Sequence, residues 1–515
     1  MTAGSPRPAR AADPRRAGPV AVLGLDLGTS SAKAVVIDTE GSLLAQASAG
    51  YAVTSATAGY AESEPDDWWS AVTACSREAV HASGARPAAI GLSGQMHGLV
   101  LTSPDGGALR PALLWPDSRA VAALRAYRLL GPAALARLAN PLAPGMAGPL
   151  LMWIAEHEPR SYAAARWALQ PKDWLRARLT SEFHAEPSDA SGTLLYDVPG
   201  DRWDLATLRA LGLDARLLAP LLPSSAAPAG RLTAAAGAEL GLPAGLPVAA
   251  GAADTAAALL GSGLVGGDDI QLTVGTGAQV IRPVAAPVSR VDAGVNLYRS
   301  ALPGRWYQMG ATLSAGLSLN WVREIMNATW EELYASAGQP GRADDPIFVP
   351  HLSGERTPYS DPALRGSWTA LALADDRTSL LRSALEGTAF SIRDALDALV
   401  ADDHPRQLRL AGGGTLAPGW RQLLADVLGV RLYAVDVPAA SGRGAALLGA
   451  HAAGLLSLAD IQGPLAPPAR LVAEPDPAGV AFHAQRRARF RRVVTALTTA
   501  RPAAGEVTDG AGGTA

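Results

Sequence analysis

The chain has 515 residues, of which 48% are hydrophobic and 18% are charged, so it can bury large cores and is not a disordered polypeptide. Its 44 basic and 47 acidic residues leave a formal charge of -3, which excludes a general basic surface for nucleic acid or an anionic membrane. Because domains average roughly 100–200 residues, this length predicts at least two lobes rather than one small binding module.

The two ends of the chain and its cysteine content indicate a cytoplasmic protein. Residues 1–18 and 501–515 are rich in Pro, Ala, Gly and Arg, so we expect disordered tails there. The apolar run after the N-terminal arginines ends at Asp26 without a small-residue cleavage site, which argues against an export signal. Cys75 is the single cysteine, so an intramolecular disulfide is excluded. Neither a membrane nor a nucleic acid is expected as a partner, while a homodimer stays open.

The first part of the chain predicts short strands joined by polar turns. Apolar patterning favours strands over 19–25, 32–37, 43–49 and 89–92, and a helix over 65–82. Small polar residues over 26–31 form the first turn, and the last of these strands leads into the loop Ser93-Gly94-Gln95-Met96-His97-Gly98. Strands mixed with helices in this way indicate an α/β fold class.

The second half of the chain begins with the same pattern as the first. Strands are expected over 270–274, 278–282 and 407–410, with glycine turns at 275–277 and 411–414 and a helix over 419–428. The pair Gly275-Thr276 repeats Gly28-Thr29 about half a chain later, and an internal duplication is the economical explanation. The Gly-rich segment 262–268 then separates an N-terminal lobe (19–262) from a C-terminal lobe (268–496), with a cleft between them.

Two carboxylates stand alone in long uncharged segments. Asp26 is the only charged residue between positions 16 and 33, and Asp254 is the only one between positions 239 and 268. A turn or a helix cap would explain one such aspartate, but both lie beside glycine-rich strand ends, which favours a functional role for the pair. We interpret Asp26 as a Mg²⁺ ligand that acts through water and Asp254 as a general base.

Three glycine-containing loops predict a grip on the phosphate groups of a nucleotide. The N–H and hydroxyl groups of small turn residues can face phosphate oxygens. Each loop alone is an ordinary turn, but their order, with Asp254 between the first two, is more specific. Lys33 could reach a phosphate or could be a solvated lysine at a strand end. The predicted cofactor-binding residues are Asp26, Gly28, Thr29, Ser30, Lys33, Gly275, Thr276, Gly277, Gly412, Gly413 and Gly414.

These loops resemble the nucleotide clamp of the superfamily that contains actin, sugar kinases and Hsp70. Further segments are similar to the FGGY carbohydrate kinases and, within that family, to its xylulokinase branch. They are 93–98 (SGQMHG), 114–119 (LWPDSR), 171–175 (PKDWL), 188–193 (SDASGT) and 352–358 (LSGERTP). The resemblance runs from about residue 20 to about residue 496, and it implies two RNase H-like lobes around an interdomain cleft.

The resemblance also implies an activity, which is ATP-dependent and Mg²⁺-dependent phosphorylation of the 5-hydroxyl of D-xylulose. Asp254 would accept the hydroxyl proton, while Gly275, Thr276, Gly412 and Gly413 would hold ATP. The residues expected at the sugar are Gln95, Met96, His97, Trp115, Asp117, Asp254 and Thr255. Taken alone, His97 would more often be a structural histidine, and its place in the Gln-Met-His-Gly loop is what favours a sugar contact.

Two departures from the xylulokinase pattern keep other functions open. Thr255 stands where an Asn commonly follows the catalytic Asp, and Pro116 replaces the Asn of the tryptophan loop. One alternative is therefore an FGGY kinase for another sugar or polyol, such as ribulose, glycerol or gluconate. Another is a non-catalytic, actin-like sensor of nucleotide or sugar, although such a sensor would not need to retain Asp254.

Overall fold

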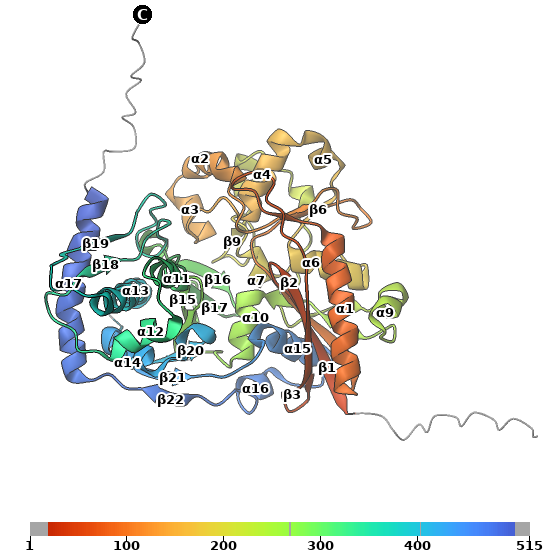
Figure 1. Cartoon of the computed structure of the whole chain (residues 1–515). Helices are drawn as coiled ribbons and strands as arrows, with labels where there is room; N and C mark the ends of the chain where they lie inside the picture. The colour runs from red at the N-terminus through yellow and green to blue at the C-terminus, as the bar shows by residue number, and fades with distance from the viewer. Residues whose placement is uncertain (1–18, 267–268, 402, 500–515) are drawn as a thin grey trace, which may run out of the picture.

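The computed structural model describes residues 19–266, 269–401 and 403–499, and it has two lobes that lie side by side (Figure 1). The tails expected at 1–18 and 501–515, and residues 267–268 of the expected lobe boundary, lie outside the described residues. Each lobe contains a mixed seven-stranded sheet covered by helices. The arrangement is an α/β fold, as the order of strand and helix patterns predicted.

The sheet of the N-terminal lobe has the order β11-β12-β5-β1-β2-β3, and β13 also pairs with β5. Strands β1, β2 and β3 form an antiparallel meander, while β5 runs parallel to β1 and β12 runs parallel to β5. The strands are β1 (Val20–Leu27), β2 (Ser31–Asp38), β3 (Leu43–Gly50), β5 (Arg86–Gly94), β11 (Pro228–Arg231), β12 (Pro247–Ala249) and β13 (Ala252–Ala253). The predicted strands therefore exist, with ends that differ by a few residues.

The helices and small strand pairs of this lobe surround its sheet. Figure 1 places α2 to α5 above the sheet and α1 along its side. The helices are α1 (Pro65–Ser83), α2 (Leu124–Arg128), α3 (Pro132–Leu138), α4 (Ala147–His157), α5 (Pro159–Ala164), α6 (Pro171–Thr180), α7 (Pro187–Ala190), α8 (Leu205–Ala210), α9 (Ala234–Leu240) and α10 (Asp254–Gly261). The two-stranded pairs are β4 (Glu62–Ser63) with β7 (Ala112–Leu113), β6 (Val100–Thr102) with β8 (Trp167–Leu169), and β9 (Tyr196–Asp197) with β10 (Arg202–Trp203).

The C-terminal lobe repeats the strand arrangement of the first. Its sheet has the order β16-β17-β15-β14-β20-β21-β22, in which β15 lies antiparallel between β14 and β17, and β20 and β21 continue parallel to β14. The strands are β14 (Gln271–Val274), β15 (Ala278–Val284), β16 (Asn296–Arg299), β17 (Trp306–Thr312), β20 (Gln407–Ala411), β21 (Arg431–Ala434) and β22 (Arg470–Ala473). Strands β1, β2, β3, β5 and β12 thus correspond in order and direction to β14, β15, β17, β20 and β21, which is what an internal duplication predicts.

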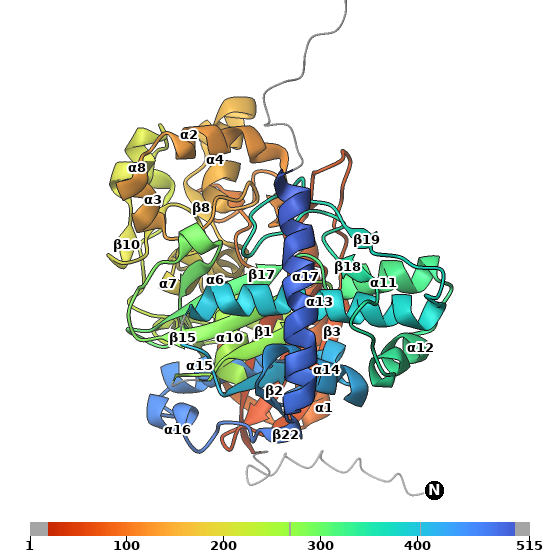
Figure 2. The ribbon, with the colours of Figure 1, turned by 90° about the vertical axis from the view of Figure 1, so that its left-hand side faces the viewer.

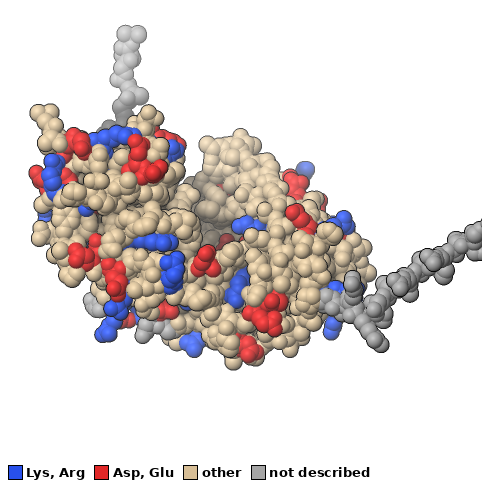
Figure 3. All heavy atoms as spheres, turned by 60° about the horizontal axis from the view of Figure 1, so that its bottom comes forward, with Lys and Arg blue, Asp and Glu red and all other residues tan. Residues whose placement is uncertain are grey.

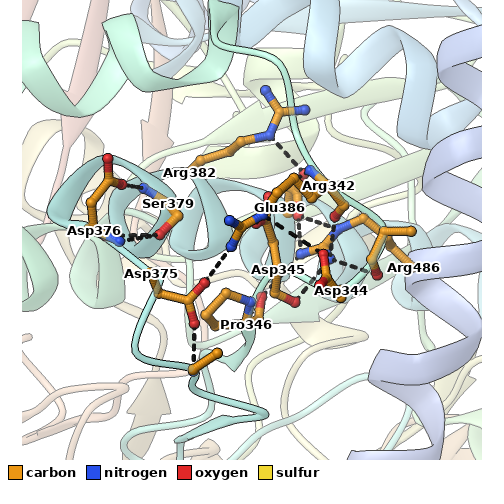
Figure 4. A network of polar contacts seen from close by, with 12 residues as sticks. Arg342, Asp344, Asp345, Pro346, Asp375, Asp376, Ser379, Arg382, Glu386 and Arg486 are labelled. Atoms are coloured by element: carbon orange, nitrogen blue, oxygen red, sulfur yellow. Dashed lines mark hydrogen bonds and ion pairs between the residues drawn. The ribbon is translucent and has the colours of Figure 1, made fainter.

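Long helices cover the C-terminal sheet, and in Figure 2 α17 crosses α13 on the side that faces the viewer. The helices are α11 (Gly316–Ile325), α12 (Trp330–Ala335), α13 (Arg377–Val400), α14 (Pro418–Leu428), α15 (Ala440–Ala452), α16 (Leu458–Gln462) and α17 (Pro477–Thr499), with the strand pair β18 (Ile347–Val349) and β19 (Ser367–Thr369). Figure 4 shows the polar network that fixes α17 to α13. There Glu386 of α13 binds Arg486 of α17 at 2.6 Å and Arg382 at 3.1 Å, and the carboxylate is 1% exposed.

Helix α15 packs on the N-terminal lobe although it comes late in the chain. It packs against β1 and β5 of the N-terminal sheet and against α10. A Cβ atom on Gly24 would lie 2.0 Å from the carbonyl oxygen of Gly442, and one on Gly91 would lie 1.7 Å from that of Ala445. Only glycine permits this backbone approach, so these two positions explain how the helix lies so close to the sheet.

On the face shown in Figure 3, basic and acidic side chains are scattered among uncharged ones rather than gathered by sign. None of the described helices combines the length and the apolarity needed to cross a bilayer.

Candidate active site

Three strand ends of the N-terminal sheet bring the two isolated carboxylates to one edge. Asp26 at the end of β1 lies opposite Ser93 of β5, and Ala252 of β13 also pairs with Ser93. Because these strands are parallel, their carboxyl ends meet at the same edge, and Asp254 follows directly after β13. Ser93 Oγ donates a 2.6 Å hydrogen bond to Asp26 Oδ1. The carboxylates therefore share a site although more than 200 residues separate them in the sequence.

The environment of Asp254 suits it to accept a proton near neutral pH. Burial and then the negative charge of Asp26 raise the pKa of Asp254 to about 7, although hydrogen bonds from Thr255 favour the ionised form. The backbone N–H and the hydroxyl of Thr255 donate to Asp254 Oδ1 at 2.5 Å and 3.1 Å. Burial also raises the pKa of Asp26, against the effects of the Ser93 hydrogen bond and the charge of Lys33. A base whose pKa lies near the working pH is the most efficient.

The first phosphate loop is the tight turn between β1 and β2. Gly28 N–H donates to the carbonyl oxygen of Ser31 at 3.0 Å, and Trp115 Nε1 donates to Thr29 Oγ1 at 2.9 Å. The indole is 48% exposed, so it bridges the predicted phosphate loop and the tryptophan loop at the surface of the site. Lys33 is exposed on β2 directly opposite Asp26, where its charge acts on that carboxylate.

The other two phosphate loops lie side by side at the edge of the C-terminal sheet. Strands β14 and β20 are parallel neighbours, so Gly275–Gly277 and Gly412–Gly414 follow adjacent strand ends. A Cβ atom on Gly414 would lie 2.3 Å from the carbonyl oxygen of Val274, whereas one on Gly413 would meet open space. The exposed backbone of Gly275, Thr276, Gly412 and Gly413 leaves room for a ligand.

The predicted sugar loop presents a neutral histidine. His97 has φ 73°, and its Nδ1 lies 2.7 Å from the carbonyl oxygen of Gly192. Because a carbonyl only accepts, Nδ1 carries the proton and Nε2 is left as an acceptor. Burial, assisted by the charge of Arg356, lowers the pKa of His97 to about 4, so the ring is uncharged at neutral pH.

Two buried polar groups near this loop have no hydrogen-bond partner among the described residues. They are the side-chain amide of Gln95, at both Oε1 and Nε2, and the hydroxyl of Tyr298. Tyr298 comes from β16 of the other lobe, and its ring centroid lies 5.9 Å from that of His97. Leaving such groups unpaired costs about 1–3 kcal/mol each, so a ligand that carries several hydroxyl groups would fit here.

A further contact joins the lobes at the same loop. The hydroxyl of Tyr307 on β17 donates to Met96 Sδ at 3.7 Å, and both side chains are buried. Met96 therefore packs into the core between the lobes. Tyr298 and Tyr307 are site residues that the sequence did not predict, because a tyrosine within a strand is indistinguishable from an ordinary core residue.

The structure places Asp117 inside the N-terminal lobe. Its Oδ2 accepts the backbone N–H of Ala61 at 2.7 Å, and its carboxylate forms an ion pair with Arg119 at 2.8 Å. Oδ1 also accepts the backbone N–H of Arg119 at 2.9 Å, and Asp117 is 1% exposed. These contacts anchor the loop that carries Trp115, so Asp117 supports the shape of the site from within.

The donor types at this site fit Mg²⁺ and a nucleotide. Asp26 provides carboxylate oxygens, which Mg²⁺ prefers, and the glycine loops provide backbone N–H groups for phosphates. Throughout the residues that the structure describes, no cluster of three or more His, Cys, Asp or Glu side chains could cage a metal ion. Mg²⁺ commonly binds through one or two carboxylates together with water and phosphate oxygens, and this donor set matches that pattern.

Comparisons with known proteins agree with this geometry. The N-terminal domain of the FGGY family of carbohydrate kinases matches residues 21–261, and the C-terminal domain of that family matches residues 271–453. The xylulose kinase of Escherichia coli (strain K12) is 32% identical over 418 residues, which cover 80% of this chain and 85% of that protein.

Two solved structures resemble the whole fold. The "xyloylose kinase" from Brucella ovis superposes with a TM-score of 0.87 at 34% identity and covers 93% of this chain and 100% of its own. Ligand-bound xylulose kinase from Lactobacillus acidophilus gives a TM-score of 0.88 at 24% identity, with 93% and 98% covered. The structural neighbours are sugar kinases with the actin/hexokinase/Hsp70-like fold, which confirms the expected fold class of two such lobes.

Proposed function

Because this chain belongs to the FGGY family of carbohydrate kinases, we propose that it transfers a phosphoryl group from ATP to the 5-hydroxyl of D-xylulose. The observation that carries the proposal is the placement of Asp254, with a pKa of about 7, at the sheet edge that also presents the Gln95-Met96-His97 loop. Sugar kinase activity follows from the family, and the choice of xylulose is supported by that loop and by the similarity to xylulose kinases.

Asp254 acts as the general base. It accepts the proton of the 5-hydroxyl as the oxygen of that hydroxyl forms a bond to the γ-phosphorus of ATP and the bond from that phosphorus to ADP breaks. Its raised pKa makes it basic enough for this step while it remains partly ionised at pH 7. Thr255 holds the carboxylate by two hydrogen bonds to one oxygen, which leaves the other oxygen for the substrate.

The sugar is held from both lobes. His97 Nε2 accepts a hydrogen bond from a sugar hydroxyl, and the amide of Gln95 supplies a donor and an acceptor with which none of the described residues pairs. Trp115 forms one wall beside Thr29, and Met96 packs behind the loop. Asp117 serves the sugar indirectly, through the loop that it anchors. Closure of the lobes around these groups excludes water, the competing acceptor of the phosphoryl group.

ATP is held by the three glycine loops. The N–H groups of Gly28 and Gly275 bond within their own turns, at 3.0 Å and 2.8 Å. The phosphates therefore meet the other N–H groups of the turn Gly28-Thr29-Ser30 in the N-terminal lobe and of the loops at 275–277 and 412–414 in the C-terminal lobe. Asp26 would hold Mg²⁺ through water, and the bound ion would supply neutralisation of the phosphate charge. We assign the first loop and the base to a lobe over 19–262 and the other two loops to a lobe over 268–496. A cytoplasmic location and a homodimer stay predictions.

One feature keeps another sugar or polyol as the second candidate. The hydroxyl of Thr255 is engaged with Asp254, so this residue offers the sugar less than the amide that is common there. The test is a panel of D-xylulose, D-ribulose, L-ribulose, glycerol and gluconate with Mg-ATP, measured as ADP release. We expect the highest kcat/KM with D-xylulose. A value no higher than for the other acceptors would refute the substrate assignment, and binding without turnover would favour the sensor.

A further inference from the structure

A buried polar cluster lies behind the segment that leads into Asp254, and the proposed reaction does not use it directly. Its charged members are Lys172, Asp173 and Arg176 on α6, with Glu186 and Asp189 at the start of α7, and each is at most 1% exposed. Hydrophobic side chains of similar volume often stabilise a protein as well as buried ion pairs do. The cluster therefore suggests a task other than stability.

Glu186 is the centre of this cluster, and it holds two serines. Its Oε1 accepts the hydroxyl of Ser188 at 2.6 Å, and its Oε2 accepts the hydroxyl of Ser225 at 2.6 Å. Ser188 Oγ in turn accepts a hydrogen bond from the backbone N–H of Ala253 at 2.9 Å. The carbonyl oxygen of Ser225 accepts one from the backbone N–H of Gly251 at 3.0 Å. Because Ser188 donates its only proton to the carboxylate, its lone pairs are directed at the peptide just before the base.

The two cations of the cluster hold the same segment from its other end. Arg176 Nη1 donates to the carbonyl oxygen of Ala250 at 2.9 Å, and Lys172 Nζ lies 3.5 Å from the same oxygen. Lys172 also pairs with Glu186 at 3.4 Å, so the cations and the carboxylate form one unit. The backbone over 250–253 is thus bound at three of its four residues by groups of this cluster.

We propose that Ser188, fixed by Glu186, is a positioning residue for the Asp254 carboxylate. Asp254 is the first residue of α10, and the direction of its side chain depends on the peptide that Ser188 binds. Without that bond the Ala253 N–H loses its buried acceptor, and the segment shifts to find another. A displacement of about 1 Å at a reacting group costs up to about 100-fold in rate. This inference rests on the proposed role of Asp254 as the base.

The test compares two buried serines, each of which accepts one N–H group and donates one hydroxyl proton. Ser188→Ala removes the positioning bond. The control Ser63→Ala removes a serine that is 1% exposed, accepts the Nε1–H of Trp68 at 2.8 Å and donates to the carbonyl oxygen of Ala52 at 2.9 Å. We expect Ser188→Ala to lower kcat for sugar phosphorylation about 10- to 100-fold, with KM for Mg-ATP within about twofold. Ser63→Ala should lower the Tm by a similar amount and leave kcat unchanged. Equal kcat in the two variants would overturn the proposal.

A double variant separates positioning from a general structural role. If Ser188 acts only through the base, Ser188→Ala should cause no further loss of sugar-dependent ADP release in the Asp254→Ala background. A further loss there would overturn the proposal. If Ser188→Ala does not fold, Ser225→Ala serves in its place, because it removes the other hydroxyl that Glu186 binds. Ser225→Ala should lower kcat and leave KM for Mg-ATP unchanged. An unchanged kcat would overturn the proposal.

A different result would refute the proposed function itself. An Asp254→Ala enzyme that keeps its sugar-dependent activity would refute the role of the base. An inactive Asp254→Ala enzyme, together with a Ser188→Ala enzyme as active as Ser63→Ala, would refute only the positioning role.

Discussion

The hydroxyl of Thr255 tunes the proton affinity of the proposed base, so its removal gives a signed prediction. Burial and the charge of Asp26 raise the pKa of Asp254 to about 7, and the Thr255 hydrogen bonds oppose that rise. Thr255→Ala removes the 3.1 Å bond from the hydroxyl but keeps the backbone bond. A hydrogen bond of this kind contributes about 1 kcal/mol, which corresponds to about 0.7 pH unit. The pKa of Asp254 in the variant should therefore lie higher than in the wild type.

The assay is the pH dependence of kcat/KM for D-xylulose between pH 5 and pH 9. With a pKa of about 7, about nine tenths of Asp254 is ionised at pH 8 and about one tenth at pH 6, so kcat/KM should fall about tenfold between them. His97, whose pKa is lowered to about 4, stays neutral throughout and adds no limb in this window.

The comparison of the two enzymes is the control, because titration of ATP affects both in the same way. The acid limb of Thr255→Ala should lie at higher pH than that of the wild type. An aspartate with the ordinary pKa of 3.8 would give a wild-type profile that is flat from pH 6 to pH 8. Such a profile would refute a raised pKa for Asp254 as the base. A limb that moves to lower pH in the variant would also refute it.

Three further predictions concern the sugar loop, a phosphate loop and the C-terminal lobe. His97→Ala should raise KM for D-xylulose roughly tenfold and leave KM for ATP nearly unchanged, because one hydrogen bond to the sugar is lost. Steady-state kinetics in which KM for ATP rises instead would contradict the placement of His97 at the sugar. Gly414→Ala should raise KM for ATP and lower the Tm, because its Cβ would lie 2.3 Å from the carbonyl oxygen of Val274. Gly413→Ala is the control and should leave the Tm of the free protein unchanged, because its Cβ would meet open space. Equal melting temperatures for the two variants would exclude the close contact. Glu386→Ala should lower the free energy of unfolding by about 3–5 kcal/mol in denaturant, because its two arginine partners would be left without a buried carboxylate. A loss under about 1 kcal/mol would show that the network of Figure 4 is not tightly coupled.

The carboxylates and glycine loops could be predicted because their signals are local. An aspartate alone in a long apolar segment stands out in a sequence, and both Asp26 and Asp254 lie at the sheet edge that this pattern favoured. The repeated Gly-Thr turns likewise indicated two similar sheets, since a tight turn after a buried strand has a clear composition. Reading these patterns required no knowledge of contacts distant in the chain.

Groups that act through distant partners could not be predicted in this way. The tautomer of His97 depends on its bond to Gly192. The hydroxyl of Tyr298, which has no partner among the described residues, points to a ligand site only because its ring lies beside that of His97. The place of Asp117 at the sugar stays a prediction, and the structure adds that this carboxylate pairs with Arg119 two residues later. Between β5 and β12 the short helices carry too few turns for a clear apolar period, so no elements were predicted there.

Sugar-dependent ADP release by the Asp254→Ala enzyme tests most directly whether Asp254 is the base of a sugar kinase. Binding of Mg-ATP, measured by calorimetry on the same preparation, serves as the control for folding. We predict that turnover with D-xylulose falls at least about 100-fold while the Kd for Mg-ATP stays within about threefold. Turnover within about threefold of the wild type would show that Asp254 is not the base.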